Sequence, residues 1–411
     1  MQAQTYPKPG KPGKLPAKPK GPHHTFTVCK GKRCRFHTIQ KGVNHAKAGD
    51  TVRVKPGTYR EAVTITGAKK RYLRLIGDVK HPSRVLLDGR NKKANGVIVS
   101  GADQVTIRGF KARDYKSNGF FVVNATGYTL RNLIAQHPGV YGIYAFNTKG
   151  GLMADSLAYY ANDGAFYIGQ TPRQAKPLRT IVRNVTGHTS ALGFSATNMR
   201  YVTITKSRFY DNALGIAPNA LDSEKYPPAE DNVITDNDIF WNNFDFHAGK
   251  PPFTVRKSGT AALAPVGTGV LLLGGRGNVI SGNRIFGNYL AGVAAIDGVL
   301  LQKHPDAIEL QRNTVRDNSF GLGGRDLNGR DVLYDGSGSG NCFGPNTSFS
   351  PSPDTTAGPD CPFTGTNAHN SADRITMLGW TGEGALKGWI KHPHAARKGV
   401  KPVEVYTGKG G

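Results

Sequence analysis

Short apolar segments, each opened by a glycine, recur along most of the chain. The segments begin at Gly96, Gly119, Gly142, Gly164, Gly193, Gly215, Gly269, Gly292 and Gly321. The first intervals are 23, 23 and 22 residues long, and insertions lengthen several of the later ones. A unit of this length, made of short strands, cannot bury its own apolar side, whereas stacked units bury it against one another. The pattern therefore predicts a solenoid.

The later repeats share a tighter pattern of apolar and amide residues. An apolar residue is followed by Asn or Ser three positions on, by an apolar residue two further, and by Asn three further. The pattern covers residues 204–212, 234–242, 280–288 and 310–318. Asn tolerates left-handed turns, and its amide can bond to the same amide of a stacked neighbour. We therefore expect Asn237, Asn283 and Asn313 to form one ladder.

The segment before the repeats has a different pattern. Ile39, Val43 and Ala46 recur at helical spacing, which predicts a helix over residues 38–48. Alternating apolar residues over 51–59 predict a strand after this helix. A helix at this place would cover the open first end of a solenoid.

Over about residues 36–345, the repeats resemble the right-handed parallel β-helix family. This is the pectin-lyase-like superfold, with repeats of the carbohydrate-binding and sugar-hydrolase type. The segment GDTVRVKPGTYREAVTITGAKKRYLRLIGD is similar to the first coil of that family. The resemblance implies an all-β fold: a single right-handed parallel β-helix solenoid with an N-terminal cap and an irregular C-terminal extension. It implies no one activity, because the same coil serves lyases, esterases, hydrolases, epimerases and phage tailspikes.

Three segments are expected from composition. Residues 1–24 alternate Pro, Lys and Gly, which predicts a disordered basic arm. Residues 25–345 are expected to form the β-helix with its cap. Residues 346–411 break the repeat and are expected to form a C-terminal loop and cap extension.

The positive charge of the chain is concentrated near its start. The formal net charge is +26, and the first hundred residues carry 23 Lys and Arg against four Asp and Glu. Three interpretations are open: a solubilising and surface-adhering arm, an arm that docks an anionic polymer, and nucleic-acid recognition. No nucleic-acid motif accompanies the charge, so no specific nucleic-acid partner is expected. No apolar run is long enough to span a membrane.

The four cysteines form two pairs that are close in sequence, Cys29 with Cys34 and Cys342 with Cys361. We expect two disulfides, which suit an oxidising compartment, and the alternatives are free thiols and a metal site. Location outside the cytoplasm, as a secreted, cell-surface or periplasmic protein, follows from this expectation. No apolar signal segment is visible at Met1, so a signal would lie upstream or have been removed.

Strand alternation sorts the residues after each glycine into two faces. The first position is expected to point inward, at Val97, Phe120, Ile143, Ala165, Phe194, Ile216, Val270 and Val293. The second is expected to point outward, which gives an aromatic row of Phe121, Tyr144 and Phe166 with Gln170 nearby. This row is covered by the tail or cap, or it is a sugar-stacking platform. A register error of one residue would exchange the two faces.

Candidate acid–base residues lie in the turns before successive strands. His137, Asp163 and His188 are expected to align as a column that can move protons next to a carboxylate. The alternative is a polar turn ladder without catalysis. The Asp-Pro-His-Asp stretch of related uronate epimerases and a paired-Asp hydrolase signature are absent.

The family resemblance also implies calcium as a candidate cofactor, because uronate-acting members often hold calcium with carboxylates. Asp222, Glu224 and Asp231 in one acidic loop supply suitable oxygen ligands. The alternative is a solvated loop.

The functional prediction is an exported, monomeric protein that engages a polysaccharide, expected to be anionic. Lyase-like or epimerase-like activity is one version of this prediction, and whether the protein is an enzyme is open at this stage. The alternative is a non-catalytic β-helix used for structure, adhesion or assembly.

Overall fold

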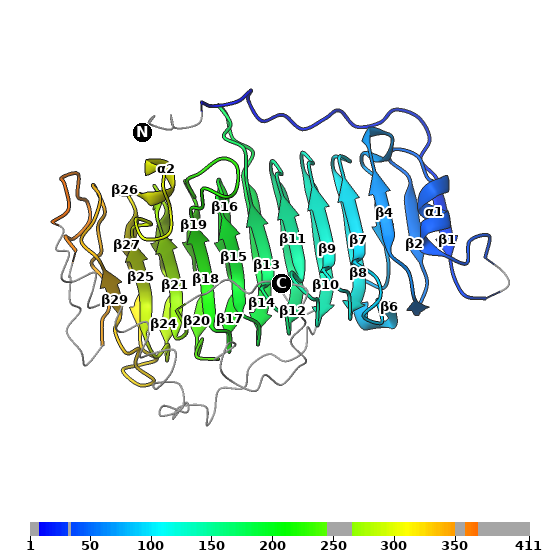
Figure 1. The fold of residues 1–411 in the computed structure, drawn as a ribbon. Coiled ribbons are helices and arrows are strands. Elements are labelled where there is room, and N and C mark those ends of the chain that lie inside the picture. Colours follow the sequence, from blue (N-terminus) through cyan, green and yellow to red (C-terminus); the bar gives the residue numbers. More distant parts are fainter. Residues whose placement is uncertain (1–7, 32–33, 245–264, 350–357, 369–411) are drawn as a thin grey trace. The chain divides into compact units, whose positions relative to one another are not determined.

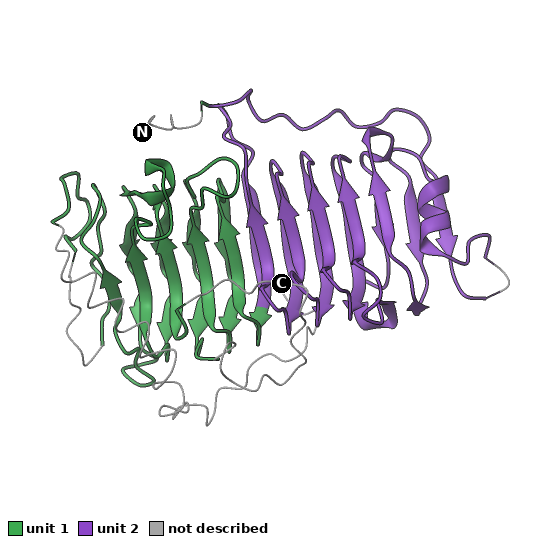
Figure 2. Ribbon diagram, in the orientation of Figure 1, with its two compact units in different colours: residues 1–8, 187–252, 262–403 green, residues 9–186, 253–261, 404–411 purple. Residues whose placement is uncertain are grey.

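The computed structural model describes residues 8–31, 34–244, 265–349 and 358–368 (Figure 1). These residues form mainly short strands, and the paired strands of the two large sheets are parallel. The all-β prediction is confirmed. The described residues divide into two compact units (Figure 2): unit 2 contains those between 9 and 186, and unit 1 contains those between 187 and 368.

Unit 2 begins with a strand and a helix and continues as stacked coils. Its helical elements are α1 (Ile39–His45), η1 (Ala68–Lys70) and η2 (Pro82–Arg84). Its strands are β1 (Thr25–Val28), β2 (Thr51–Val54), β3 (Gly57–Tyr59), β4 (Val63–Thr66), β5 (Arg74–Ile76), β6 (Val85–Asp88), β7 (Asn95–Ser100), β8 (Val105–Arg113), β9 (Asn118–Val123), β10 (Tyr128–Gln136), β11 (Ile143–Phe146), β12 (Gly151–Tyr159), β13 (Gly164–Gly169) and β14 (Thr180–His188), of which the last ends in unit 1.

Each full coil of unit 2 pairs one long and one short strand with the same strands of the next coil. The long strands β8, β10 and β12 pair in parallel, and so do β4, β7, β9, β11 and β13. A left-handed residue bends each long strand in the middle: Gly109, Asn132, Asp155 and Asn184 have φ angles of 78°, 54°, 48° and 50°. Gly, Asn and Asp are the residues that adopt this conformation most readily.

Unit 1 repeats this arrangement with the long strand divided in two. Its helix is α2 (Pro305–Ile308). Its strands are β15 (Leu192–Thr197), β16 (Val202–Thr205), β17 (Arg208–Tyr210), β18 (Leu214–Asn219), β19 (Val233–Thr235), β20 (Asp238–Phe240), β21 (Thr268–Leu273), β22 (Gly275–Arg276), β23 (Val279–Ser281), β24 (Arg284–Phe286), β25 (Ala291–Ile296), β26 (Leu310–Gln311), β27 (Thr314–Arg316), β28 (Ser319–Phe320) and β29 (Val332–Tyr334).

The recurring glycines stand where consecutive coils approach closely. A Cβ atom on Gly119 would lie 2.6 Å from the carbonyl oxygen of Gly142, and one on Gly269 would lie 2.5 Å from that of Gly292. Seven of the residues predicted to point inward are fully buried in inward-facing columns: Val97, Phe120, Ile143, Phe194, Ile216, Val270 and Val293. The inward prediction is wrong for Ala165, because Phe166 takes the inward position of that strand beside Ile143. The core of each unit is therefore a set of apolar columns stacked coil on coil.

Helix α1 covers the first end of unit 2, which confirms the predicted cap. Thr38 caps the helix by accepting from the Lys41 N–H. The carboxylate of Glu61 accepts the N–H groups of Ile39 and Gln40, each at 3.1 Å. Three helix residues are buried, Ile39, Gly42 and Val43, so one face of the helix closes the apolar interior.

Asparagine ladders run through unit 1. In one ladder, each side-chain amide accepts from the N–H and the side-chain amide of the Asn before it and donates to the next Asn. This ladder contains Asn237, Asn283, Asn318 and Asn346. Two others contain Asn212, Asn242, Asn288 and Asn328, and Asn232, Asn278, Asn313, Asn341 and Asn367.

The predicted membership of the first ladder is wrong at one rung. Asn237 and Asn283 bond to each other, but Asn313 stands in a neighbouring ladder. The strand register explains the difference: Ile280 pairs with Val315, so Asn318 lies next to Asn283. Within each coil the Asn residues recur every five positions, as at Asn313 and Asn318. The pattern alone does not tell which of these two residues lies next to Asn283, and the prediction chose the wrong one.

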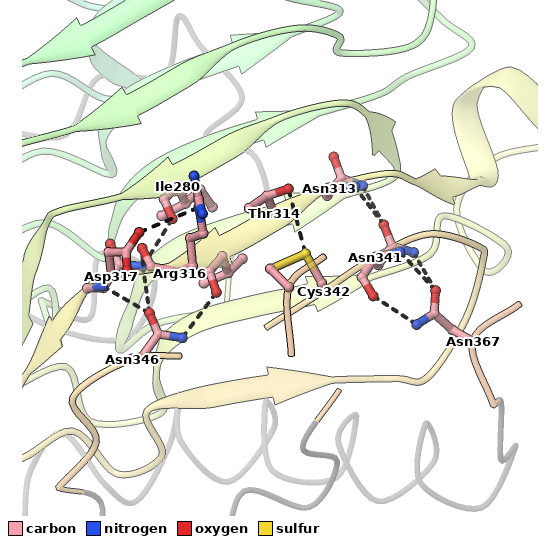
Figure 3. Close-up of a disulfide and its surroundings, with 12 residues drawn as sticks. Ile280, Asn313, Thr314, Arg316, Asp317, Asn341, Cys342, Asn346 and Asn367 are labelled. Atoms are coloured by element: carbon pink, nitrogen blue, oxygen red, sulfur yellow. Dashed lines mark hydrogen bonds and ion pairs between the residues drawn. A yellow bond between two sulfur atoms is a disulfide. The ribbon is translucent and has the colours of Figure 1, made fainter. Parts of the chain in front are cut away.

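Both expected disulfides are present. Cys29 is bonded to Cys34 in unit 2, with Cα atoms 5.8 Å apart, and Cys342 is bonded to Cys361 in unit 1, at 5.0 Å. Figure 3 shows Cys342 between the rungs of two Asn ladders. The hydroxyl of Thr314 lies 3.7 Å from its sulfur. The second disulfide therefore ties the segment that leads to Asn367, the last rung of one ladder, to the coil that carries Asn341 and Asn346.

The basic arm differs from the expectation of disorder where it is described. Gly10 N–H donates to the Arg173 carbonyl at 2.9 Å, and Gly13 N–H donates to the Lys176 carbonyl at 2.8 Å. Residues 1–7 lie outside the described residues, as do 350–357 and 369–411 of the predicted C-terminal extension. The three predicted segment boundaries stay predictions.

Among the described residues, none of the helices is both long and apolar enough to cross a membrane.

Candidate functional site

An aromatic surface follows the outward positions of β9, β11 and β13 in unit 2. Strand pairing places Phe121 beside Tyr144, and Tyr144 beside Tyr167. Two residues later, Phe146 occupies the next outward position of β11, and Tyr141 lies in the turn before β11. Parallel pairing stacks side chains of the same face directly over one another, so the repeat itself assembles these rings.

The rings are in contact. Phe121 and Tyr144 are stacked, with centroids 4.2 Å apart and planes 3° apart. Tyr144 also meets Tyr141 at 4.7 Å and Tyr167 at 4.8 Å, the latter edge-on. Phe146 lies 5.8 Å from Tyr144. Tyr144 is thus the centre of the cluster.

The exposure of the rings differs across the cluster. Phe121, Tyr141, Tyr144 and Phe146 are half-buried, so part of each ring faces solvent. Tyr167 is 2% exposed and supports them from below. Its ring lies over Gly169, where a Cβ atom would meet the Tyr167 hydroxyl at 2.2 Å, so only glycine fits at this outward position.

A row of amides borders the rings where the strands end. Asn124, Asn147 and Gln170 follow β9, β11 and β13 and have φ angles of 55°, 51° and 49°. The Asn147 side-chain amide donates to Asn124 Oδ1 at 2.7 Å. Together the five aromatic residues and these three amides form what we call the aromatic–amide face of unit 2. It offers flat apolar rings beside hydrogen-bonding groups, the combination that binds amphipathic ligands.

The outward prediction is correct for Phe121 and Tyr144 and wrong for Phe166. Phe166 pairs with Ile143 of the inward column and is fully buried, and Tyr167 takes the outward position. Ala165 lies over Gly142, so in this coil the residues are offset by one from the glycine. Gln170 follows β13, at the position that Asn147 occupies after β11.

Phe146, Asn124 and Asn147 were missed in the sequence. The 23-residue repeat was the available signal, because Phe146 lies 23 positions after Val123 and Asn147 lies 23 after Asn124. The prediction considered only the first two positions after each glycine and so ended before these residues.

The candidate acid–base residues occupy different places. His137 Nδ1 lies 2.8 Å from Asp114 Oδ1, a contact between consecutive coils that the sequence did not indicate. The N–H of Asp163 donates to the Val140 carbonyl, so Asp163 lies over Val140, three residues beyond His137. The predicted alignment of His137 with Asp163 is therefore wrong.

His188 belongs to unit 1, where its ring stacks on Tyr210 with centroids 5.1 Å apart. The two rings are nearly parallel, and His188 is 7% exposed. Burial lowers the pKa of His188 to about 4, so the imidazole is neutral at pH 7. The ring continues an aromatic column through Tyr210, Phe240 and Phe286.

The acidic loop of unit 1 does not fit a calcium site. The carboxylate of Asp222 accepts the N–H groups of Lys303 and His304, and thereby joins two loops. Glu230, in the same loop, forms a buried ion pair with Arg200 at 3.0 Å. Among the described residues, which include Asp222, Glu224 and Asp231, no three acidic, His or Cys side chains gather to hold a metal ion.

These observations define the class of the protein as a parallel β-helix, with an aromatic–amide face on one sheet. The family model "Right handed beta helix region" matches residues 179–344 and supplies the hand of the coil, as predicted. No curated protein sequence matches the chain.

Among solved structures that are similar to the chain, one reaches a TM-score of 0.50 and supports the fold. The A-module of mannuronan C-5 epimerase AlgE6 from Azotobacter vinelandii is 17% identical, with a TM-score of 0.50 over 75% of this chain and 89% of that one. Pectate lyase Pel9A is 16% identical, with a TM-score of 0.45 over 85% and 90% of the two chains. The alginate lyase from Paenibacillus sp. str. FPU-7 is 15% identical, with a TM-score of 0.43 over 76% and 97%. At these identities the likeness concerns the fold alone.

Proposed function

We propose that the protein binds a polysaccharide on the aromatic–amide face. The observation that carries the proposal is the stacked pair Phe121 and Tyr144, whose two residues are half-buried. The C–H groups of a sugar ring pack on such surfaces, and its hydroxyls pair with amides. Asn124, Asn147 and Gln170 stand in the right place for the second role.

The proposal includes an anionic polymer and an oxidising location. The net charge of +26 favours an acidic chain over a neutral one, since long-range attraction raises its local concentration. The two disulfides suit a secreted, cell-surface or periplasmic protein. The protein would act there as a monomer.

Substitution of the central ring tests the proposal. Tyr144→Ala removes the ring that contacts Phe121, Tyr141 and Tyr167, so we expect affinity for the polymer to fall about tenfold. Titration calorimetry with polygalacturonate, alginate and a neutral glucan measures the loss and ranks the polymers.

Tyr159→Ala is the matched control, because Tyr159 is a half-buried tyrosine of unit 2 on β12, outside the aromatic–amide face. It should bind like the wild type. Equal affinities of the Tyr144 variant and the wild type would refute the proposal.

A second candidate is proton transfer by His137. Its contact with Asp114 is the specific observation in favour, because a carboxylate fixes the orientation of an imidazole that acts as a base. Abstraction of the proton next to the carboxylate of a uronate would give an elimination if the C4–O glycosidic bond then breaks and the leaving oxygen takes up a proton. It would give an epimerisation if a proton returns to the opposite face of the sugar.

The test is the absorbance of unsaturated product after incubation with a panel of polyuronates. Product formed by the wild type and not by His137→Ala would support proton transfer by His137. If no polyuronate is turned over, the protein is a binding or assembly module.

A further inference from the structure

Residues 9–20 contact unit 2 with a period of three. Gly13, Pro16 and Pro19 are half-buried, and all other residues of this segment are exposed. The polar contacts have the same period: Gly10 and Gly13 donate their N–H groups to the loop after β13, and the Pro16 carbonyl accepts from the Tyr72 hydroxyl at 2.6 Å. A polyproline II helix has three residues per turn, so one ridge of such a helix lies on the protein. Figure 1 shows the segment crossing the ends of the unit 2 strands.

The contact ridge leaves no space for a side chain at Gly13. A Cβ atom on Gly13 would lie 2.7 Å from the Leu178 side chain and 2.9 Å from the Lys176 carbonyl. Gly10 also accepts, through its carbonyl, the N–H of Ala175 at 3.2 Å. Pro9 and Pro12 lie between the contact positions, and Pro16 and Pro19 lie on them. Proline has a restricted backbone, so little conformational entropy is lost when the segment docks.

The same period arranges the lysines. Positions 11, 14, 17 and 20 form a second ridge of the same period, and all four are exposed. Three of them are lysines, Lys11, Lys14 and Lys20, and the fourth is Ala17. One polyproline turn advances about 9 Å, so Lys11 and Lys14 stand about 9 Å apart along one line and Lys20 follows about 18 Å further on. The segment contains no acidic residue to neutralise them and no aromatic residue on which a nucleobase could stack.

We propose that residues 9–20 form a docked cationic strap that binds the carboxylates of a linear acidic polysaccharide. The strap is a site separate from the aromatic–amide face and does not depend on the function proposed for that face. Docking fixes the lysines in a row before the polymer arrives, so binding loses less entropy than it would on a mobile tail. The attraction is between exposed charges and weakens as salt screens it.

Two variants separate a fixed row of charges from a charged tail. Lys11→Gln/Lys14→Gln/Lys20→Gln removes the ridge, and we expect about tenfold weaker binding of polygalacturonate at low salt, with convergence at high salt. Gly13→Val keeps every charge but cannot dock, and we expect about threefold weaker binding. Hydrogen exchange at the Gly10 amide reports docking directly: it should be slow in the wild type and fast in Gly13→Val.

The charge control is Lys41→Gln/Lys80→Gln/Lys92→Gln, which removes three exposed lysines of unit 2 outside the strap. It should bind polygalacturonate like the wild type. Tyr144→Ala should keep the salt dependence that Lys11→Gln/Lys14→Gln/Lys20→Gln loses, which separates this proposal from the previous one. Wild-type affinity in Gly13→Val, equal loss in the charge control, or tighter binding of polyphosphate or duplex DNA than of polygalacturonate would each overturn it.

Discussion

At the scale of single residues, the coil stack gives identical residue types different chemistry. His137 lies at a turn, 2.8 Å from a carboxylate, whereas His188 is buried against the ring of Tyr210. Burial disfavours the imidazolium form, and the pKa of His188 is lowered to about 4. His188 is therefore a packing residue whose titration is coupled to folding.

This coupling predicts acid sensitivity. The unfolded chain protonates His188 near pH 6.5 and the folded chain does not, so stability is lost as pH falls through this range toward 4. Between about pH 7 and pH 5, His188 should account for a loss of about 2 kcal/mol in the free energy of unfolding. His188→Phe keeps a ring on Tyr210 but has no group that titrates, so its free energy of unfolding should fall less over the same pH range. Urea denaturation across this range measures both proteins, and parallel curves would contradict the prediction.

At the scale of elements, the Asn ladders bind the turns of unit 1 together. Asn283 accepts from the N–H and the side chain of Asn237, each at 3.0 Å, and donates to Asn318 at 3.0 Å and to the Ile234 carbonyl at 2.9 Å. The residue is 1% exposed. A buried polar group that loses its hydrogen-bond partner lowers the free energy of unfolding by more than the bond had contributed. The stability contributed by each middle Asn of the ladder therefore depends on the Asn residues on both sides of it.

Asn283→Leu should therefore destabilise the protein by about 1–3 kcal/mol, because it leaves two buried donors of Asn237 without an acceptor. Asn346→Leu is the matched control at the end of the same ladder, where the residue is half-buried and water can replace the lost bonds. Thermal denaturation should give a clearly larger loss for Asn283→Leu. Similar losses at the two rungs would count against a cooperative ladder.

At the scale of the whole molecule, each of the two compact units contains one disulfide. Cys29–Cys34 lies beside the cap of unit 2, and Cys342–Cys361 lies where the ladders of unit 1 end. The bonds close loops of different length, with sequence separations of 5 and 19 residues. A longer closed loop restricts the unfolded chain more.

Removing the disulfide that closes the longer loop should therefore cause the larger loss in the free energy of unfolding. We expect a loss of about 3 kcal/mol for Cys342→Ser/Cys361→Ser and about 2 kcal/mol for Cys29→Ser/Cys34→Ser. Chemical denaturation of the two double variants under the same conditions gives the comparison. The opposite order would show that native contacts near the cysteines, and not loop length, determine the effect.

The sequence by itself determined the coil, because the period of about 23 residues, the glycines at close approaches and the Asn positions are local requirements of each turn. It also indicated the cap, both disulfides and the rings of Phe121 and Tyr144. The tertiary structure decided register: Tyr167 and not Phe166 faces outward, and Asn318 and not Asn313 follows Asn283. The tertiary structure also decided the pairing of Asp114 with His137 and the docking of Gly13, because both join residues that are far apart in the sequence. A strand alternates every two residues, so a shift of one residue exchanges its faces, and only the neighbouring coil fixes that shift.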